Sequence, residues 1–310
     1  MKVACVGCGT IGRSWALFFA LKGFEVNVYD ASGDVLVIAF NDIRAWLKLL
    51  ARKGVTETKQ TERVVSRIKP TSSLGDAVKD VDYVQESTPE KLELKKQLFK
   101  EISALTKPST ILASSTSGLL MTEIQKAALK PERCITVHPI NPPHLIPLVE
   151  VIPGKETSED TVRKAYDFML KLEKVPIIVR KEVPGFVFNR LAYALWREAL
   201  DLLDKGVATV EDIDKAVYAG MGLRWAIMGP FLTYHLGGGE RGLKHFIDHL
   251  EPAFWSCWKS METWTSIPPS ATKKATNGIK QTDLVKAKTY GELVRWRDEK
   301  LIDLLKLLSS

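Results

Sequence analysis

The fold is decided by the stretch Lys2-Val3-Ala4-Cys5-Val6-Gly7-Cys8-Gly9-Thr10-Ile11-Gly12. Its first five residues predict a short buried strand, and the rest matches the pattern G-x-G-x-x-G. Residues 13–21 then predict a helix, and residues 25–30 predict a second strand that ends in an acid. Strand, glycine turn, helix, strand and acid follow one another in the order that a dinucleotide site requires.

Each glycine of this turn has its own expected role. Gly7 allows the tight turn, Gly9 lets the backbone approach a pyrophosphate, and Gly12 lets the helix pack close to the strand. The helix N-terminus then faces the phosphates with its N–H groups and its positive dipole end. We therefore expect the cofactor to contact Gly7, Gly9, Thr10, Ile11, Gly12 and Asp30.

The acid at the end of the second strand indicates which dinucleotide is bound. Asp30 can accept hydrogen bonds from both ribose hydroxyls, whereas a 2′-phosphate there would meet a carboxylate. The two residues that follow, alanine and serine, offer no cation to such a phosphate. The sequence therefore predicts NAD rather than NADP.

Composition and charge narrow the class of protein. The chain has 310 residues, enough for two domains, with 45% apolar and 26% charged residues. No apolar run reaches the length of a membrane span. The net charge is +7, but basic and acidic residues alternate along the chain, so we expect no nucleic-acid partner. The four cysteines lack the spacing of a disulfide framework or a metal site, which favours free thiols, no bound metal and a cytoplasmic location.

The pattern of elements divides the chain in two. Further strands are predicted around 68–72, 82–86, 110–114, 134–138, 148–152 and 175–179, with helices between most of them. This alternation favours a Rossmann-type, doubly wound and mostly parallel sheet over residues 1–183. An insertion at 34–67 predicts two helices broken at Lys53-Gly54. From Pro184 onward apolar residues recur at helical spacing, so residues 184–310 are predicted to form an all-helical domain.

Three further clusters carry candidate chemistry. Ser117 belongs to a serine-rich turn just after a predicted strand, where an open α/β sheet binds its ligands. His138 ends another strand and can take a proton from an alcohol, while Glu150, an acid inside an apolar strand, is expected to hold its other ring nitrogen. Asn189 follows the domain junction, where its amide could donate to a substrate oxygen.

Taken together, these motifs resemble those of the L-3-hydroxyacyl-CoA dehydrogenase family over nearly the whole chain. The shared order is GxGxxG, acid, V-x-E-S-x-P-E, S-S-T-S, H-P-x-N-P-P, L-V-E and P-G-F-x-x-N-R. The resemblance implies that His138 is the catalytic base with Glu150 as its partner, and that Ser117 and Asn189 bind the reacting oxygen. It also implies that Glu90 and Lys95 contact the nicotinamide side of the cofactor, and that the helical domain forms a homodimer.

Within this family the chain is most similar to the branch of λ-crystallin and L-gulonate 3-dehydrogenase, and it shares a G-L-R-W pattern at 222–225 with carnitine dehydrogenases. It departs from the thioester enzymes at Ser115, where they usually carry asparagine, and at Arg224. An arginine near the active site can bind a free carboxylate, which a thioester lacks at that point. We therefore expect an NAD-dependent dehydrogenase of a small L-3-hydroxy acid, similar to L-gulonate or carnitine, with Arg224 on the substrate. The alternatives are a 3-hydroxyacyl-CoA dehydrogenase and a non-enzymatic dinucleotide-binding protein.

Overall fold

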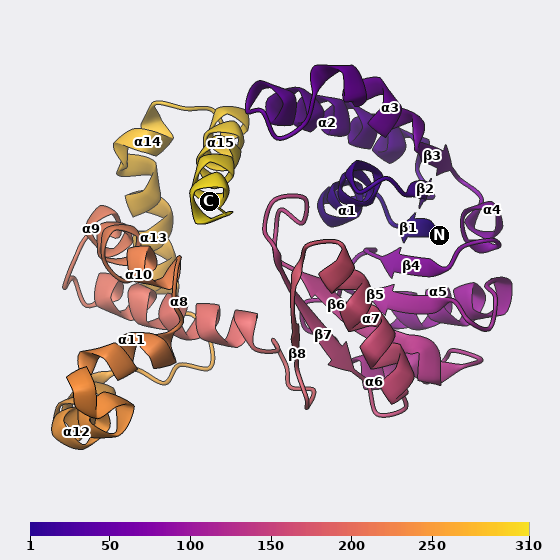
Figure 1. Ribbon diagram of the computed structural model, residues 1–310. Helices are drawn as coiled ribbons and strands as arrows, with labels where there is room; N and C mark the ends of the chain where they lie inside the picture. The colour runs from indigo at the N-terminus through magenta and orange to yellow at the C-terminus, as the bar shows by residue number, and fades with distance from the viewer. Residues whose placement is uncertain (310) are drawn as a thin grey trace. The chain divides into compact units, whose positions relative to one another are not determined.

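The computed structural model describes residues 1–309, which form two compact units (Figure 1). The first unit comprises Met1–Arg190 and the second begins at Leu191. This division falls inside α8 (Phe188–Asp204), whose first turn is still hydrogen-bonded to the first unit, at the carboxylate of Glu150 and the carbonyl of Ser117. No helix within residues 1–309 combines the length and the apolar character needed to cross a membrane.

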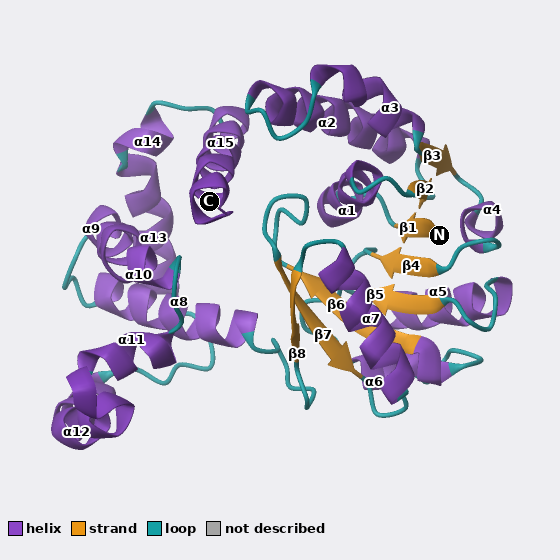
Figure 2. Ribbon diagram, in the orientation of Figure 1, coloured by secondary structure: helices purple, strands orange, loops and turns teal. Residues whose placement is uncertain are grey.

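The strands of the described residues form one sheet in the first unit (Figure 2). Its order is β3-β2-β1-β4-β5-β6-β7-β8, and neighbouring strands are parallel except β6 and β7, which are antiparallel. The strands are β1 (Lys2–Val6), β2 (Glu25–Tyr29), β3 (Ile68–Thr71), β4 (Tyr83–Glu86), β5 (Ile111–Ser114), β6 (Cys134–Pro139), β7 (Leu148–Pro153) and β8 (Val175–Ile178). Each strand predicted from the sequence is present, and the expected doubly wound, mostly parallel sheet is confirmed.

The helices of the first unit connect these strands. They are α1 (Thr10–Leu21), α2 (Gly33–Arg52), α3 (Thr61–Ser66), α4 (Leu74–Val78), α5 (Leu92–Leu105), α6 (Met121–Gln125) and α7 (Glu159–Lys171). Short 3₁₀ turns lie at Thr58–Gln60 and Pro131–Arg133. The insertion between β2 and β3 does contain two helices, α2 and α3, with a break after Arg52 as predicted.

The core of this unit lies on both faces of the sheet, because adjacent strand residues point to opposite faces. Tyr83 packs with Phe19 of α1 and Phe168 of α7, with ring centroids 6.0 and 4.9 Å from its own. Its neighbour Val84 belongs instead to an apolar cluster that includes Leu98 of α5. This packing on both faces holds the strands in place, and with them the turns at their carboxyl ends, where candidate residues lie.

The second unit consists of helices within the described residues (Figure 2). After α8 these are α9 (Val210–Lys215), a π-helical segment (Ala216–Met221), α10 (Gly222–Trp225), α11 (Pro230–Gly237), a 3₁₀ turn (Gly239–Arg241), α12 (Gly242–Ser260), α13 (Pro269–Gln281), α14 (Asp283–Lys286) and α15 (Tyr290–Ser309). The predicted helical character is confirmed. Few apolar side chains of this unit are buried, among them Leu200, Ala271 and Ile302.

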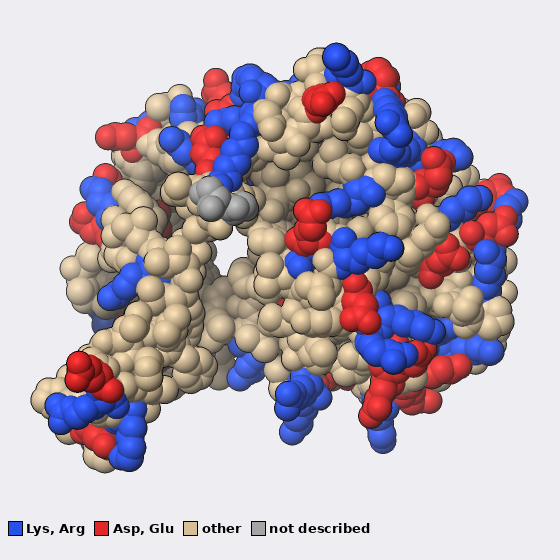
Figure 3. Space-filling view, in the orientation of Figure 1, with Lys and Arg blue, Asp and Glu red and all other residues tan. Residues whose placement is uncertain are grey.

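The surface charges are mixed. On the face shown in Figure 3, basic and acidic side chains alternate over the first unit rather than separating into patches of one sign. The net charge of +7 is therefore not gathered on that face into the continuous basic stripe typical of nucleic-acid binding.

Candidate active site

The glycine turn lies in close contact with neighbouring backbone atoms. Gly7 has a positive φ of 89°, and a Cβ there would lie 2.9 Å from the backbone of Ser87, which follows β4. A Cβ on Gly12 would overlap the carbonyl oxygen of Gly7. A Cβ on Gly9, by contrast, would meet no described atom within 4 Å. The turn is thus filled by protein at Gly7 and Gly12 and open at Gly9, as a pyrophosphate approaching the start of α1 requires.

Asp30 lies beside this turn at the end of β2. Its Oδ2 accepts the backbone N–H of Cys8 at 2.8 Å, and its Oδ1 accepts the N–H of Ser32 at 3.0 Å. Each carboxylate oxygen has a second lone pair for a ribose hydroxyl. The side chain therefore also fixes the glycine turn against β2, a role that the sequence did not indicate. These residues fit a dinucleotide.

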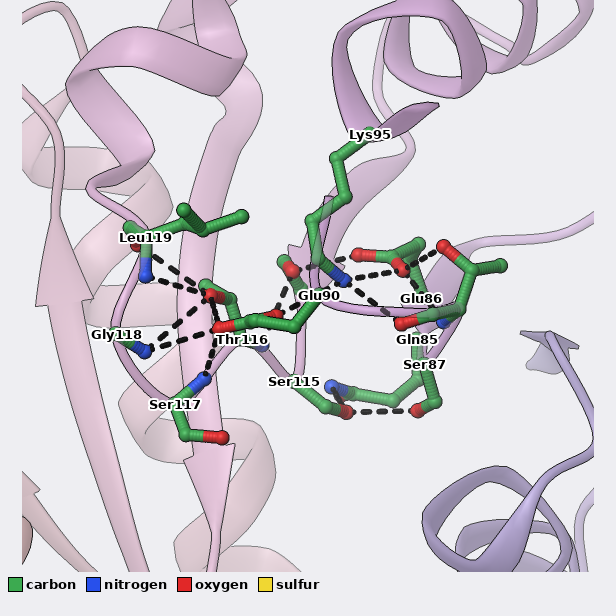
Figure 4. Close-up of polar contacts among 12 residues, drawn as sticks. Gln85, Glu86, Ser87, Glu90, Lys95, Ser115, Thr116, Ser117, Gly118 and Leu119 are labelled. Atoms are coloured by element: carbon green, nitrogen blue, oxygen red, sulfur yellow. Dashed lines mark hydrogen bonds and ion pairs between the residues drawn. The ribbon is translucent and has the colours of Figure 1, made fainter. Parts of the chain in front are cut away.

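A second group of polar side chains joins the ends of β4 and β5 (Figure 4). Glu86 is fully buried and accepts from the Lys95 ammonium at 2.7 Å and from the Ser114 hydroxyl at 2.6 Å. Only 1% of Lys95 is exposed, and its Nζ also lies 3.5 Å from Oε2 of Glu90. A buried ammonium is costly unless it is paired, and the carboxylates of Glu86 and Glu90 supply the partners that Lys95 needs.

Glu90 in turn holds the turn that contains Ser117. Its Oε1 accepts from the Thr116 hydroxyl at 2.5 Å and from the N–H groups of Ser117 and Gly118 at 3.0 and 3.1 Å. Partial burial alone would raise the pKa of Glu90. The Thr116 hydrogen bond, the Lys95 charge and the two backbone donors outweigh it and lower that pKa below its usual value. The Ser117 hydroxyl points away from this cluster (Figure 4).

His138 and Glu150 stand directly opposite each other on the antiparallel strands β6 and β7. The His138 Nδ1 lies 2.7 Å from the Glu150 Oε2, with Glu150 fully buried and His138 5% exposed. An ionised carboxylate only accepts, so Nδ1 carries the hydrogen and Nε2 is the basic nitrogen. The pairing inferred from an acid inside an apolar strand is thus present in the structure.

The other oxygen of Glu150 holds the segment that leads into α8. Its Oε1 accepts the N–H groups of Val187 and Phe188 at 2.9 and 3.0 Å. The chain reaches this position through Gly185 and Phe186, both of which have positive φ, 78° and 52°. The φ of Phe186 is unfavourable for a residue with a Cβ. It places the ring centroid 5.5 Å from that of His138, in full burial.

Asn189 completes a connected set. Its amide nitrogen donates to the backbone carbonyl of Ser117 at 3.0 Å, and its side chain is largely buried. Glu150 therefore connects the candidate residues. One of its oxygens contacts His138, and the other accepts the N–H of Phe188. The next residue, Asn189, bonds to Ser117. Arg224 is not part of this set. It lies exposed in α10 of the second unit.

A buried lysine near the site was not anticipated. Lys174 precedes β8 and is only 4% exposed, with its ammonium 4.1 Å from the ring centroid of Phe18 and 5.3 Å from that of Trp15. It donates to the carbonyls of Pro143 and, at 2.8 Å, Ile146, in the loop that follows His138. Burial, together with the charge of nearby Lys22, lowers the pKa of Lys174 to about 7.

That same loop also contacts the start of α1. Ser14 Oγ lies 2.8 Å from the ring Nδ1 of His144 and accepts its backbone N–H at 3.0 Å. The His144 ring stacks on Trp46 of α2, with centroids 4.6 Å apart. The loop after His138 is therefore fixed to the helix that begins at the glycine turn.

Comparison with known proteins agrees with this geometry. The NAD-binding domain of 3-hydroxyacyl-CoA dehydrogenase matches residues 2–183, and the C-terminal domain of the same enzymes matches residues 185–269. The chain belongs to the 3-hydroxyacyl-CoA dehydrogenase family. It is accordingly an NAD-dependent oxidoreductase that acts on a CH–OH group, as the sequence predicted.

Individual relatives extend over nearly the full length. The chain is 40% identical to an L-carnitine dehydrogenase of Streptomyces coelicolor over 307 residues, covering 98% of this chain and 94% of that one. It is 38% identical to an L-carnitine dehydrogenase of Bacillus cereus, covering 100% and 93%. These matches support the expected oxidation of a 3-hydroxy acid.

Solved structures give the same picture. The NAD⁺-dependent 5-formyl-3-hydroxy-2-methylpyridine 4-carboxylic acid 5-dehydrogenase superposes with a TM-score of 0.84 at 30% identity, covering 100% of this chain and 98% of that one. The 3-hydroxybutyryl-CoA dehydrogenase of Escherichia coli gives 0.70 at 30% identity, covering 90% and 57%.

Proposed function

We propose that this enzyme oxidises the 3-hydroxyl of a small free L-3-hydroxy acid, L-carnitine, to the 3-keto acid with NAD. The choice of L-carnitine as substrate rests on the near-complete coverage of L-carnitine dehydrogenases at about 40% identity. The proposed oxidation rests on the buried His138–Glu150 pair, joined to Ser117 through Asn189. L-gulonate is the other free acid that the sequence suggests.

His138 is the proposed general base. Its Nε2 takes the hydroxyl proton of the substrate, while bound NAD supplies the acceptor for the hydride from C3. The Glu150 carboxylate, 2.7 Å from Nδ1, stabilises the imidazolium that this proton creates. Phe186 covers the imidazole and excludes water from one side of it.

Ser117 and Asn189 are proposed to hold the reacting oxygen. The Ser117 hydroxyl can donate to it, and Asn189 has a second amide hydrogen besides the one directed at the Ser117 carbonyl. Two such donors stabilise the partial negative charge that the oxygen carries as its proton leaves.

Arg224 is the proposed partner of the substrate carboxylate. Its guanidinium can form a bidentate pair with a free carboxylate but not with a thioester. The quaternary ammonium of carnitine would favour aromatic faces, which the tryptophan-rich second unit supplies in number. On the cofactor side we propose Asp30 for the adenosine ribose, the glycine turn for the pyrophosphate, and Glu90 with Lys95 for the nicotinamide side.

A screen of NAD reduction tests this function. The purified enzyme is offered L-carnitine, L-gulonate, 3-hydroxybutyrate and 3-hydroxybutyryl-CoA at equal concentration, and kcat/KM is measured for each. We expect L-carnitine to give the highest value. A much higher value for the CoA ester than for every free acid would replace this proposal with the acyl-CoA activity.

We further propose that the enzyme is a homodimer joined through its second unit. Large apolar side chains there are unusually exposed for an isolated domain: Leu191 63%, Tyr193 60%, Trp196 53%, Phe231 79%, Trp255 53% and Trp258 62%. Light scattering of the purified protein tests this proposal. A cytoplasmic location is also proposed, because all four cysteines are free thiols.

A further inference from the structure

We propose that Glu90 is a positioning residue for Ser117, in addition to the cofactor contact that the family resemblance implies. The proposal rests on the proposed function, because it assigns Glu90 to the orientation of a residue that would bind the reacting oxygen. It begins from the three donors that converge on Glu90 Oε1: the Thr116 hydroxyl and the N–H groups of Ser117 and Gly118.

These contacts fix the backbone on both sides of the Ser117 side chain. The N–H of Ser117 donates to Glu90 at 3.0 Å, and its carbonyl accepts from the Asn189 amide at 3.0 Å. With both peptide groups held, the Cα–Cβ bond of Ser117 has one direction. The hydroxyl points away from Glu90 (Figure 4), so holding the turn does not use it and it remains available to a substrate oxygen.

Thr116 reinforces this arrangement. Its hydroxyl oxygen donates to Glu90 and accepts the N–H of Leu119 at 3.0 Å, which closes the turn on itself. The turn is therefore folded around the carboxylate, and removal of that carboxylate leaves the N–H groups of Ser117 and Gly118 without their principal acceptor.

Glu90 is itself held in place by Lys95. Its Oε2 lies 3.5 Å from the Lys95 ammonium, which is anchored to the fully buried Glu86 at 2.7 Å. The lowered pKa of Glu90 agrees with a carboxylate that stays ionised at neutral pH. The position of Ser117 is thus set by a series of charged groups that begins inside the sheet at β4.

Amide hydrogen exchange tests the structural part of the proposal without reference to activity. Peptides covering residues 116–119 are compared in the wild-type enzyme and in Glu90→Ala, Glu90→Gln and Glu93→Ala. Glu93 is the matched control, because it is an exposed carboxylate three residues along the chain, in the first turn of α5, and pairs with half-buried Lys96 at 2.9 Å. We expect Glu90→Ala to speed exchange about tenfold or more, Glu90→Gln less, and Glu93→Ala not at all. Unchanged exchange in Glu90→Ala would overturn the proposal.

A double-mutant cycle with Ser117→Ala tests the functional part. Glu90→Ala should lower kcat by about 10–100-fold at saturating NAD, the cost of a misplaced group. In combination with Ser117→Ala it should add little, because the serine that it positions is already gone. Losses that multiply, or an effect confined to the KM for NAD, would instead make Glu90 a cofactor contact only. If the wild-type enzyme oxidises no 3-hydroxy acid, the proposed function fails, while the exchange result still decides whether Glu90 holds the turn.

Discussion

Replacement of the buried Lys174 should make the free energy of unfolding depend differently on pH. The pKa of Lys174 is lowered to about 7 in the folded enzyme, first by burial and then by the nearby Lys22 charge. In the unfolded chain the pKa returns to about 10.4. Between these values the unfolded chain binds more protons than the folded one, so stability rises with pH through this window. The slope is at most about 1.4 kcal/mol per pH unit, and the total over the whole window is on the order of 5 kcal/mol. Below the folded value both states are protonated and the contribution is constant.

Urea unfolding of the wild-type enzyme and of Lys174→Met, from about pH 6 to about pH 9.5, measures the pH-dependent contribution of Lys174 to the free energy of unfolding. The difference in unfolding free energy between them should be flat below about pH 6.5 and should then shift steadily in favour of the wild type. Lys171→Met, which removes an exposed lysine of α7, should show no such trend. A Lys174→Met difference that stays constant up to pH 9.5, or moves the other way, would refute the burial argument.

Three further predictions concern cofactor and catalysis. Asp30→Ala should weaken NAD binding by about 1–3 kcal/mol and narrow the preference for NAD over NADP, measured by titration with both cofactors; equal use of both by the wild-type enzyme would contradict the assignment. His138→Gln should lower kcat by about 10²–10⁴-fold with NAD affinity nearly unchanged. Near-normal turnover would exclude His138 as the base. Arg224→Met should raise KM for a free 3-hydroxy acid about tenfold or more while any activity on a CoA ester stays the same, and an unchanged KM would remove Arg224 from the substrate site.

The sequence predicted the strands and the pairing of His138 with Glu150 because both depend on local signals. A fully buried strand is a short apolar run, and an acid inside such a run needs a partner. Glu150 accordingly stands opposite His138 on the neighbouring strand. Glu86 likewise ends an apolar strand, but its pairing with Lys95 was not predicted, because Lys95 was expected only from the family resemblance and as a contact of the cofactor.

Other features depend on packing between distant segments and could not be predicted. Lys174 is buried only because α1 and the loop after β6 close over it, and no local pattern indicates that. The hold of Glu90 on the Ser117 turn is likewise a contact across 27 residues. In the second unit, helical spacing predicted the helices, but it could not show that its tryptophans lie exposed or, for Trp264, half-buried.

The most direct test of the central claim follows the hydride itself. L-carnitine that carries deuterium at C3 is oxidised by the enzyme with NAD, and the reduced cofactor is analysed by mass spectrometry. The account predicts that deuterium from C3 appears in the reduced cofactor in step with formation of the 3-keto acid, and that His138→Gln slows both together. Reduced cofactor without deuterium, or transfer only from C3-deuterated 3-hydroxybutyryl-CoA and never from the free acid, would contradict it.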